Sequence, residues 1–214
     1  MRVTRLGYGS MGLRGPRTWG IRCVSDADAE AFLHAVLDAG INFIDTAPDY
    51  GVSEQRIGDF IGSRRDEYYQ APKCVCDYVQ HQDHLEIRHT WTREVILRNL
   101  ETSLRRLRTD RIDLMQFHGG DAHSLQQTGL IELLRELREQ GVIRFIGVSS
   151  KLPELPELVN LGVFDTFQIP YSCLAPEHEA WISQAAQAGA GIIVRGGVAQ
   201  GGPAAGIQRP NLND

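Results

Sequence analysis

The sequence lacks the features that mark secreted, membrane-spanning and nucleic-acid-binding proteins. Its 214 residues include only four cysteines, too few and too scattered for a disulfide framework. No apolar run approaches the roughly 20 residues that cross a bilayer, and the amino terminus has no apolar segment of a signal peptide. A net charge of -5 leaves no basic excess for nucleic acid or an anionic membrane. We therefore expect a cytoplasmic protein with neither kind of partner.

The cysteines also lack the spacing of a known metal site. Cys74 and Cys76 precede His81 and His84, but this order matches no familiar zinc pattern. Small thiols at the end of an apolar strand usually pack in a core, so we interpret both cysteines as core residues and predict no metal. Four histidines are predicted to be solvated loop residues: His81, His84, His89 and His123.

What the sequence does contain is a regular alternation of short apolar strands and amphipathic helices. Helical stripes follow the predicted N-caps Ser25 and Thr92, and two more end at Gly141 and Gly189. The predicted strands are 4–10, 41–45, 68–74, 111–118, 142–150, 165–171 and 191–196. Seven β units without a turn-linked hairpin imply one domain over residues 1–214 with a parallel sheet, either a (β/α)₈ barrel or a doubly wound sheet. Residues 76–91 are expected to cross one rim.

Polar residues recur where these strands end. Because the carboxyl ends of parallel strands open onto one face, we expect these side chains to share a site. They are Asp45, Lys73, His118, Ser149 with Ser150, Gln168 and Arg195. Other polar positions have simpler interpretations: Glu54 supports the first turn of its helix, Arg105 and Arg106 form a solvated face, and Gly51 serves a tight turn.

Four of these positions suggest proton transfer. An ammonium such as Lys73 beside the Tyr50 hydroxyl would lower the phenol pKa below its usual value of about 10. Asp45 would keep that ammonium charged, and His118 could orient a substrate oxygen or share its proton. Together they predict proton delivery to an oxygen that gains negative charge, as a carbonyl oxygen does during reduction.

The segments that carry these residues resemble one family. GINFIDTAPDYGVSE at 40–54, APKC at 71–74, RIDLMQFH at 111–118 and GVIRFIGVSS at 141–150 are similar to motifs of the aldo-keto reductases. These are NAD(P)H-dependent oxidoreductases on a (β/α)₈ barrel, and the resemblance covers nearly the whole chain. It implies that Tyr50 is the general acid, that Lys73 and Asp45 tune it, and that His118 orients the carbonyl of a small aldehyde or ketone.

The resemblance also implies a nicotinamide cofactor. Ser149 and Gln168 would hold its carboxamide, and Ser150 stands where the family often has Asn. Arg195 takes the place of an aromatic ring that stacks on the nicotinamide, a role that a planar guanidinium can fill. Gly196 and Gly197 begin a glycine-rich loop that could hold phosphate. NADPH is the expected cofactor, with NADH as the alternative.

The carboxyl-terminal part departs from the family pattern. Seven predicted strands leave the eighth βα unit of a closed barrel unaccounted for, so we expect the chain to be incomplete after Asp214. That unit would decide between NADP and NAD. Trp19, Tyr78 and Trp91 are candidate walls of the substrate pocket. A second hypothesis is a nucleotide-binding barrel with a regulatory or scaffolding role and little turnover.

Overall fold

The computed structural model describes residues 1–16, 18, 24–174 and 176–197. The chain divides into two compact units: unit 1 is Met1–His118 with Ser124–Ile146, and unit 2 is Gly119–His123 with Gly147–Asp214. Strand pairs β1 with β2, β2 with β3, β4 with β7, β8 with β9 and β9 with β10 are all parallel. The protein is therefore α/β with parallel sheets, as the sequence predicts.

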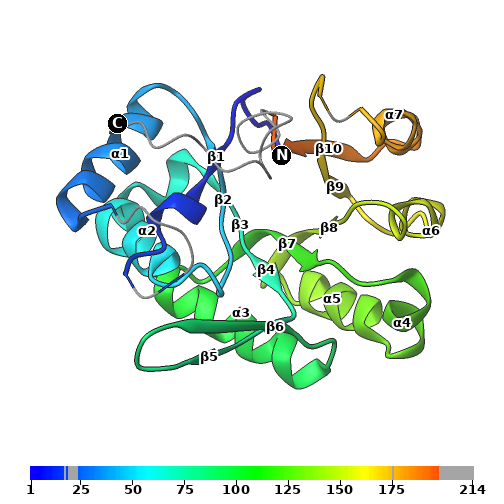
Figure 1. Ribbon diagram of the computed structural model, residues 1–214, viewed down its shortest axis with the longest axis horizontal. Helices are drawn as coiled ribbons and strands as arrows, with labels where there is room; N and C mark the ends of the chain where they lie inside the picture. Colours follow the sequence, from blue (N-terminus) through cyan, green and yellow to red (C-terminus); the bar gives the residue numbers. More distant parts are fainter. Residues whose placement is uncertain (17, 19–23, 175, 198–214) are drawn as a thin grey trace, which may run out of the picture. The chain divides into compact units, whose positions relative to one another are not determined.

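Unit 1 holds most of the elements and is built from βα units in chain order (Figure 1). Its elements are β1 (Tyr8–Gly9), η1 (Ser10–Leu13), α1 (Asp26–Asp38), β2 (Phe43–Asp45), α2 (Ser53–Ile61), η2 (Gly62–Glu67), β3 (Tyr69–Ala71), β4 (Lys73–Cys74), β5 (Cys76–Gln80), β6 (Leu85–His89), α3 (Arg93–Leu107), β7 (Ile112–His118) and α5 (Leu130–Glu139). Helix α4 (Ala122–Gln127) and strand β8 (Ile143–Ser149) run through the boundary between the units.

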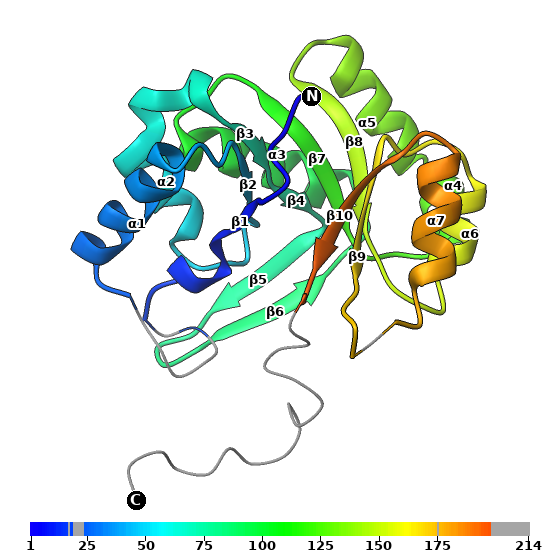
Figure 2. The same cartoon turned by 90° about the horizontal axis from the view of Figure 1, so that it is seen from above.

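Unit 2 continues the same alternation with α6 (Leu155–Asn160), β9 (Thr166–Pro170), α7 (Glu179–Gln187) and β10 (Gly191–Arg195). The two helices pack together on one side of β9 and β10 (Figure 2). The register sets Ser149 of β8 opposite Gln168 of β9. Among the described residues of the whole chain, no helix is both long and apolar enough to cross a membrane.

The helices begin where their capping residues predict. The Ser25 hydroxyl accepts a hydrogen bond from the Asp28 amide at 3.1 Å, and the Thr92 hydroxyl accepts one from the Val95 amide at 3.3 Å. Each bond satisfies an amide that the first helical turn leaves without a backbone partner. Both predicted caps are confirmed.

Residues 76–91 differ from the prediction. Most of them form the antiparallel hairpin β5–β6, with Cys76 paired to His89 at its base. The expectation that no turn-linked hairpin interrupts the βα order is therefore wrong. The segment is largely polar and carries histidines and acids near its turn. Polar residues on both faces of its strands hide the apolar/polar alternation from which a strand is predicted.

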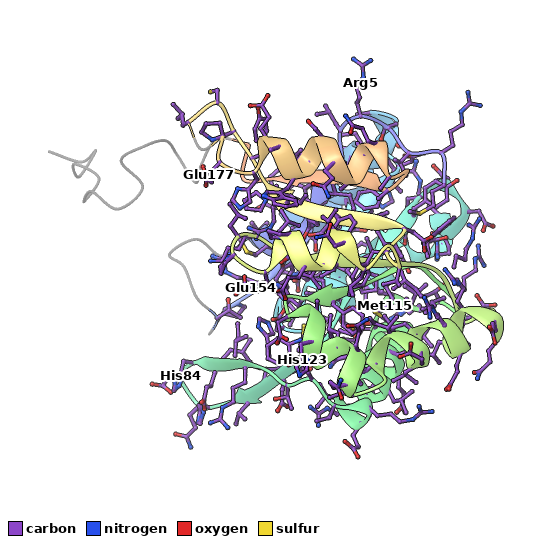
Figure 3. The ribbon with its side chains drawn as sticks, turned by 90° about the vertical axis from the view of Figure 1, so that its right-hand side faces the viewer. Arg5, His84, Met115, His123, Glu154 and Glu177 are labelled. Carbon is purple, nitrogen blue, oxygen red and sulfur yellow. The ribbon has the colours of Figure 1, made fainter. Side chains whose placement is uncertain are left out.

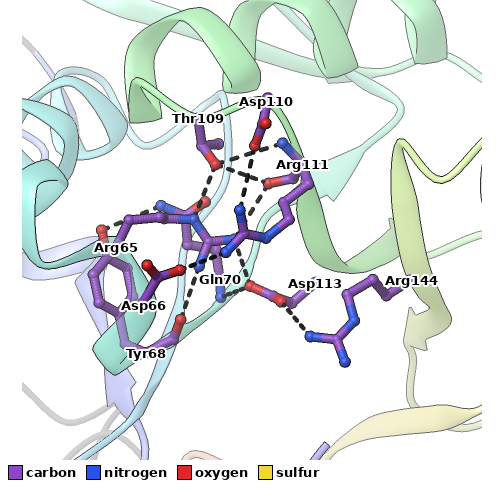
Figure 4. Close-up of polar contacts among 9 residues, drawn as sticks. All are labelled: Arg65, Asp66, Tyr68, Gln70, Thr109, Asp110, Arg111, Asp113 and Arg144. Carbon is purple, nitrogen blue, oxygen red and sulfur yellow. Dashed lines mark hydrogen bonds and ion pairs between the residues drawn. The ribbon is translucent and has the colours of Figure 1, made fainter.

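A buried carboxylate anchors one part of unit 1 (Figure 4). Asp113 on β7 is 2% exposed and accepts hydrogen bonds from Arg65 at 2.6 Å, from the Gln70 amide at 3.0 Å and from Arg144 at 3.2 Å. An ionised carboxylate in the interior is stable only when it is paired and hydrogen-bonded. Asp113 thus holds η2 and β3 against β7.

Replacing Asp113 with Asn should lower the free energy of unfolding by about 3 kcal/mol, because Arg65 loses its buried counter-charge. Urea unfolding measures the change. Asp110→Asn is the matched control, since Asp110 is 88% exposed at 3.4 Å from Arg111, and its effect should stay within about 0.5 kcal/mol. Equal losses in the two variants would contradict a structural role for the Asp113 cluster.

Candidate active site

The centre of the site is a buried ion pair in unit 1 between Lys73 and Asp45. Lys73 on β4 is 1% exposed, and its Nζ donates to Asp45 Oδ1 at 2.7 Å and to the Thr46 carbonyl at 3.0 Å. Burial by itself would lower the pKa of Lys73, but the Asp45 carboxylate and Tyr50 outweigh it and raise that pKa. Lys73 is therefore a fixed positive charge inside the unit.

Gln116 completes the support of this pair and was missed from the sequence. It lies opposite Lys73 in the β4–β7 register, and its Nε2 donates to Asp45 Oδ1 at 3.1 Å and to the Ala71 carbonyl at 3.3 Å. Gln116 and His118 are two residues apart on β7, so they point to the same side of the strand. The sequence did hold one signal for Gln116: it is a polar residue in an apolar strand, two positions before the candidate catalytic histidine.

Tyr50 follows β2 by five residues and lies beside the ammonium, with Lys73 Nζ 5.1 Å from the centre of its ring. Burial is the largest influence on the phenol and raises its pKa. Lys73 acts in the opposite direction through its charge and a hydrogen bond, while Asp45 and Asp49 raise the pKa further. The net pKa of Tyr50 is raised, so the prediction that Lys73 lowers it below the usual value is wrong. The sequence suggested the cation but not the burial or the second carboxylate.

The turn that presents Tyr50 depends on Gly51. Its φ is +53°, and a Cβ there would lie 2.1 Å from the Arg14 carbonyl oxygen. That same oxygen accepts a hydrogen bond from the Val52 amide at 3.0 Å. The loop can therefore press against the backbone after η1 only because residue 51 has no side chain. The prediction of a tight turn is confirmed.

His118 ends β7 and faces Tyr50 edge-on, with ring centres 6.3 Å apart. Burial lowers the pKa of His118, and the nearby Lys73 charge adds to this, against the opposing hydrogen bond to the Asp49 carboxylate. The ring is therefore neutral near pH 7 and can donate one hydrogen bond and accept another. Asp45, Tyr50, Lys73 and His118 thus lie together in unit 1.

Asp49 and His89 also belong to this environment, although no pattern in the sequence singled them out. Asp49 is 2% exposed, and its Oδ2 lies 3.4 Å from both His118 Nδ1 and His89 Nε2. The two imidazole rings are 4.5 Å apart. Burial opposes ionisation of Asp49, but the hydrogen bonds with both histidines outweigh it and lower the pKa of the carboxyl.

The prediction that His89 is a solvated loop residue is wrong, because β6 carries it back to the base of the hairpin. By contrast, His81 and His84 stack on each other with exposed side chains. Figure 3 shows His84 at the outer end of the hairpin. His123 is exposed as predicted but lies in α4. The hairpin places His89 beside His118 and keeps His81 and His84 with each other. The spacing of these histidines in the sequence could not show this.

Helices α2 and α3 pack together near the Tyr50 loop. Glu54 lies in the first turn of α2 as predicted, but the prediction for Arg106 fails. Arg106 does not lie on a solvated face: it donates to the Pro48 carbonyl at 3.0 Å and to the Tyr78 hydroxyl at 2.7 Å. Glu54 is fully buried and accepts a hydrogen bond from Ser103 at 2.6 Å. Gly58 permits this close contact, since a Cβ there would lie 2.0 Å from the Arg106 carbonyl oxygen.

The buried Glu54 carboxyl should make stability depend on pH. Burial raises its pKa to about 7 from 4.5, despite the opposing hydrogen bond of Ser103 and the charge of Arg106. Between these values the folded chain holds a proton that the unfolded chain has released. The free energy of unfolding should therefore fall as pH rises through this window, by up to about 3 kcal/mol.

Urea unfolding at about pH 5 and about pH 8 measures this fall, which Glu54→Gln should largely remove because a neutral amide does not titrate. Glu101→Gln is the control, since Glu101 is an exposed residue of the same helix as Ser103. An unchanged pH dependence in Glu54→Gln would contradict the assignment to this carboxyl.

The residues predicted to hold the cofactor lie in unit 2. Ser149, Ser150 and Gln168 are buried at 6%, 5% and 3% exposure, and the Ser150 amide donates to the Gln168 carbonyl at 3.0 Å. Arg195 ends β10 opposite Pro170 in the register and is exposed, as are Gly196 and Gly197 after it. Unit 2 therefore presents hydroxyl and amide side chains at the ends of adjacent strands.

The three predicted pocket walls have different outcomes. Trp19 lies outside the described residues. Tyr78 is engaged by Arg106, whose guanidinium also lies 5.7 Å from the centre of the Tyr78 ring. Trp91 lies edge-on to His89 at 6.2 Å, and its buried Nε1 has no hydrogen-bond partner among the described residues.

Comparison with known proteins identifies the family. The sequence profile described as the Aldo/keto reductase family matches residues 5–210, nearly the whole chain. The chain belongs to the aldo/keto reductase family. The resemblance noted in the strand-end motifs is thereby confirmed.

Individual relatives agree with the family match. This aldo/keto reductase chain is 34% identical over 183 residues to aldo-keto reductase YhdN of Bacillus subtilis, covering 83% of this chain and 53% of the relative. The holo form of aldo-keto reductase AKR11C1 from Bacillus halodurans has a TM-score of 0.81 and 32% identity, over 94% of this chain and 64% of that one.

An aldo/keto reductase from Klebsiella pneumoniae, solved in complex with NADP and acetate, has a TM-score of 0.71 and 25% identity. The match covers 94% of this chain and 66% of that one. The chain spans about half the length of the curated relatives that it matches first.

Proposed function

We propose that this chain catalyses the NAD(P)H-dependent reduction of an aldehyde or ketone to the alcohol. The observation that supports this best is the buried Lys73 ammonium, hydrogen-bonded to Asp45 at 2.7 Å and lying 5.1 Å from the Tyr50 ring. A protonated phenol beside a fixed positive charge can give a proton to an oxygen and tolerate the negative charge that remains.

Each member of the group has one task in this proposal. Tyr50 donates its phenolic proton to the carbonyl oxygen of the substrate, and its raised pKa keeps that proton in place at neutral pH. Lys73 stabilises the tyrosinate that results, and Asp45 holds the ammonium. His118, neutral because of burial, orients the carbonyl from the end of β7.

The donor set of unit 2 fits a nicotinamide carboxamide, which needs both hydrogen-bond donors and acceptors. Ser149 and Gln168 would hold this amide, Ser150 would support them, and Arg195 would stack on the ring. Gly196 and Gly197 would accommodate phosphate. The cofactor supplies the hydride that reduces the carbonyl carbon. NADP is the first candidate because a related enzyme of Klebsiella pneumoniae was solved with it, and NADH is the alternative.

The architecture that goes with this function is the (β/α)₈ barrel of the family, with both units as parts of one domain. The parallel pairing within each unit and the βα order support this. Tyr78 on strand β5 and Trp91 just after β6 are proposed to line the substrate entrance together with Trp19.

Titration with NADPH and with NADH, followed by turnover on a panel of small aldehydes and ketones, tests the proposal. Binding should quench protein fluorescence at one site per chain, and NADPH should be oxidised only when a carbonyl compound is present. Binding without oxidation by any member of the panel would contradict the proposal and favour a regulatory nucleotide-binding protein instead.

A further inference from the structure

Four side chains of the kinds that bind metal ions lie close together, and His118 is one of them. Asp49 comes from the loop after β2, Cys76 from the start of β5, His89 from the end of β6 and His118 from the end of β7. Cys76 and His89 are opposite each other in the hairpin register, so closing the hairpin brings both donors to its base. One carboxylate, one thiol and two imidazoles form a typical donor set for a transition metal.

The distances among these donors approach those of a coordination sphere. Asp49 Oδ2 is 3.4 Å from His118 Nδ1 and 3.4 Å from His89 Nε2, and Cys76 Sγ is 3.5 Å from His118 Nδ1. All the donor atoms lie within 4.8 Å of one another. A tetrahedral zinc site with bonds of about 2.0–2.3 Å has edges of about 3.3–3.8 Å. Three pairs already have this separation, and the others need only small side-chain movements.

Hydrogen bonding within the cluster leaves groups unsatisfied. Contacts of 3.4–3.5 Å are long for hydrogen bonds between these groups. The second carboxylate oxygen, Asp49 Oδ1, is buried and has no hydrogen-bond partner among the residues that the structure describes. A buried polar atom without a partner is costly, and a cation beside Asp49 would remove that cost.

The backbone around Cys76 is held in place independently of the cluster. The Asn99 side chain accepts from the Cys76 amide at 2.8 Å and donates to the Cys76 carbonyl at 2.8 Å. Asn99 lies on α3, so a regular helix fixes the position of the thiol. Such support around a ligand limits the reorganisation that metal binding requires.

We propose that Asp49, Cys76, His89 and His118 bind one divalent transition-metal ion, with zinc as the ion that fits this donor set best. With the thiol ionised, the carboxylate and thiolate balance the two positive charges of the metal, and both imidazoles bind as neutral ligands. Binding replaces the Cys76 thiol proton with the metal, so each ion bound releases one proton to the solvent.

Metal binding would also regulate turnover, a consequence that rests on the proposed function. A metal bound to His118 Nδ1 fixes the ring against Asp49 and Cys76, so the ring can no longer adjust to a substrate carbonyl. Metal binding also neutralises the negative charge of Asp49 next to the Tyr50 loop. We therefore expect zinc to inhibit carbonyl reduction reversibly, with a chelator restoring it.

Binding is tested on the purified chain after chelator treatment, by titration calorimetry with zinc chloride and by absorption spectra with cobalt chloride. One ion per chain should bind, and the cobalt form should show a thiolate charge-transfer band and the intense bands of tetrahedral cobalt. Cys76→Ser should abolish the charge-transfer band, and both Cys76→Ser and His89→Gln should weaken binding by more than the roughly 10–100-fold typical of outer-shell changes.

His84→Gln and Cys173→Ser are the matched controls, because they remove an exposed imidazole and an exposed thiol outside the cluster. Binding should be unchanged in both. Failure to bind either metal, binding that survives in Cys76→Ser and His89→Gln, or binding lost in His84→Gln would overturn the site. Circular dichroism of each variant verifies that it is folded.

The activity assay separates this proposal from the preceding one. Zinc inhibition that disappears in His89→Gln supports the regulatory consequence, and zinc binding without inhibition overturns it. If the chain binds zinc as described but reduces no carbonyl compound, the proposed function fails while the metal site stands.

Discussion

Replacing Tyr50 with Phe should lower kcat for carbonyl reduction by about 10³-fold or more, because the substrate oxygen loses its proton donor. The ring and its contact with His118 remain, so folding and NADPH affinity should change little. Single-turnover oxidation of bound NADPH, followed by its absorbance, measures the chemical step directly. The expected loss is in kcat and in kcat/KM together, as for a group that acts only in the transition state.

Tyr69→Phe is the matched control for this prediction. Tyr69 lies on β3, where the Arg144 guanidinium is 6.0 Å from the centre of its ring, and it takes no part in the proposed chemistry. Activity should stay within a few-fold of the unmodified chain. A Tyr50→Phe chain that reduces aldehydes at nearly the original rate would refute the role of the phenol as general acid.

Lys73→Met should have the second large effect, on both activity and stability. Methionine fills a similar volume but removes the ammonium, which leaves the Asp45 carboxylate without its cation. Breaking a buried ion pair on one side costs about 3–5 kcal/mol of folding free energy. Reduction should also fall by about 10²–10³-fold, because nothing then stabilises the tyrosinate.

The double replacement Lys73→Met with Asp45→Asn separates these two effects. The neutral amide that replaces the Asp45 carboxylate carries no charge, and its oxygen can still accept from Gln116, so much of the lost stability should return. Activity should not return, since the ammonium is still missing. Urea unfolding and steady-state kinetics on the same preparations give both quantities. Recovery of activity along with stability would show that Lys73 acts only as a structural residue.

Much of the fold was predictable because its signals are local. The apolar runs, the caps Ser25 and Thr92, and the glycines that end α5 and α7 each act within a few residues of the chain. The hairpin β5–β6 was not predictable in the same way. Its residues are mostly polar, and its stability comes from cross-strand pairs and from Asn99 on α3 rather than from a buried stripe.

The site also divides into residues that local sequence signals identify and properties that only the tertiary structure sets. Asp45, Lys73 and His118 were found because each lies at or near the end of a predicted apolar strand, a position that sequence alone can identify. The error about the Tyr50 pKa had a physical origin: the effect of Lys73 was correctly foreseen, but burial and the charges of Asp45 and Asp49 are larger in sum. Desolvation depends on everything that surrounds a group, and no local pattern reports it.

The sequence by itself determined the order of βα units, the strand-end residues and the family, because periodicity, capping and motif spacing are properties of the chain. Only the tertiary structure decided what surrounds those residues. Gln116 donates to Asp45, Asp49 contacts both His89 and His118, and Arg106 donates to the Pro48 carbonyl. These partners are separated by tens of residues, and which of them meet is set by strand register and helix packing. Contacts of this kind fix the charges and pKa values on which the chemistry depends.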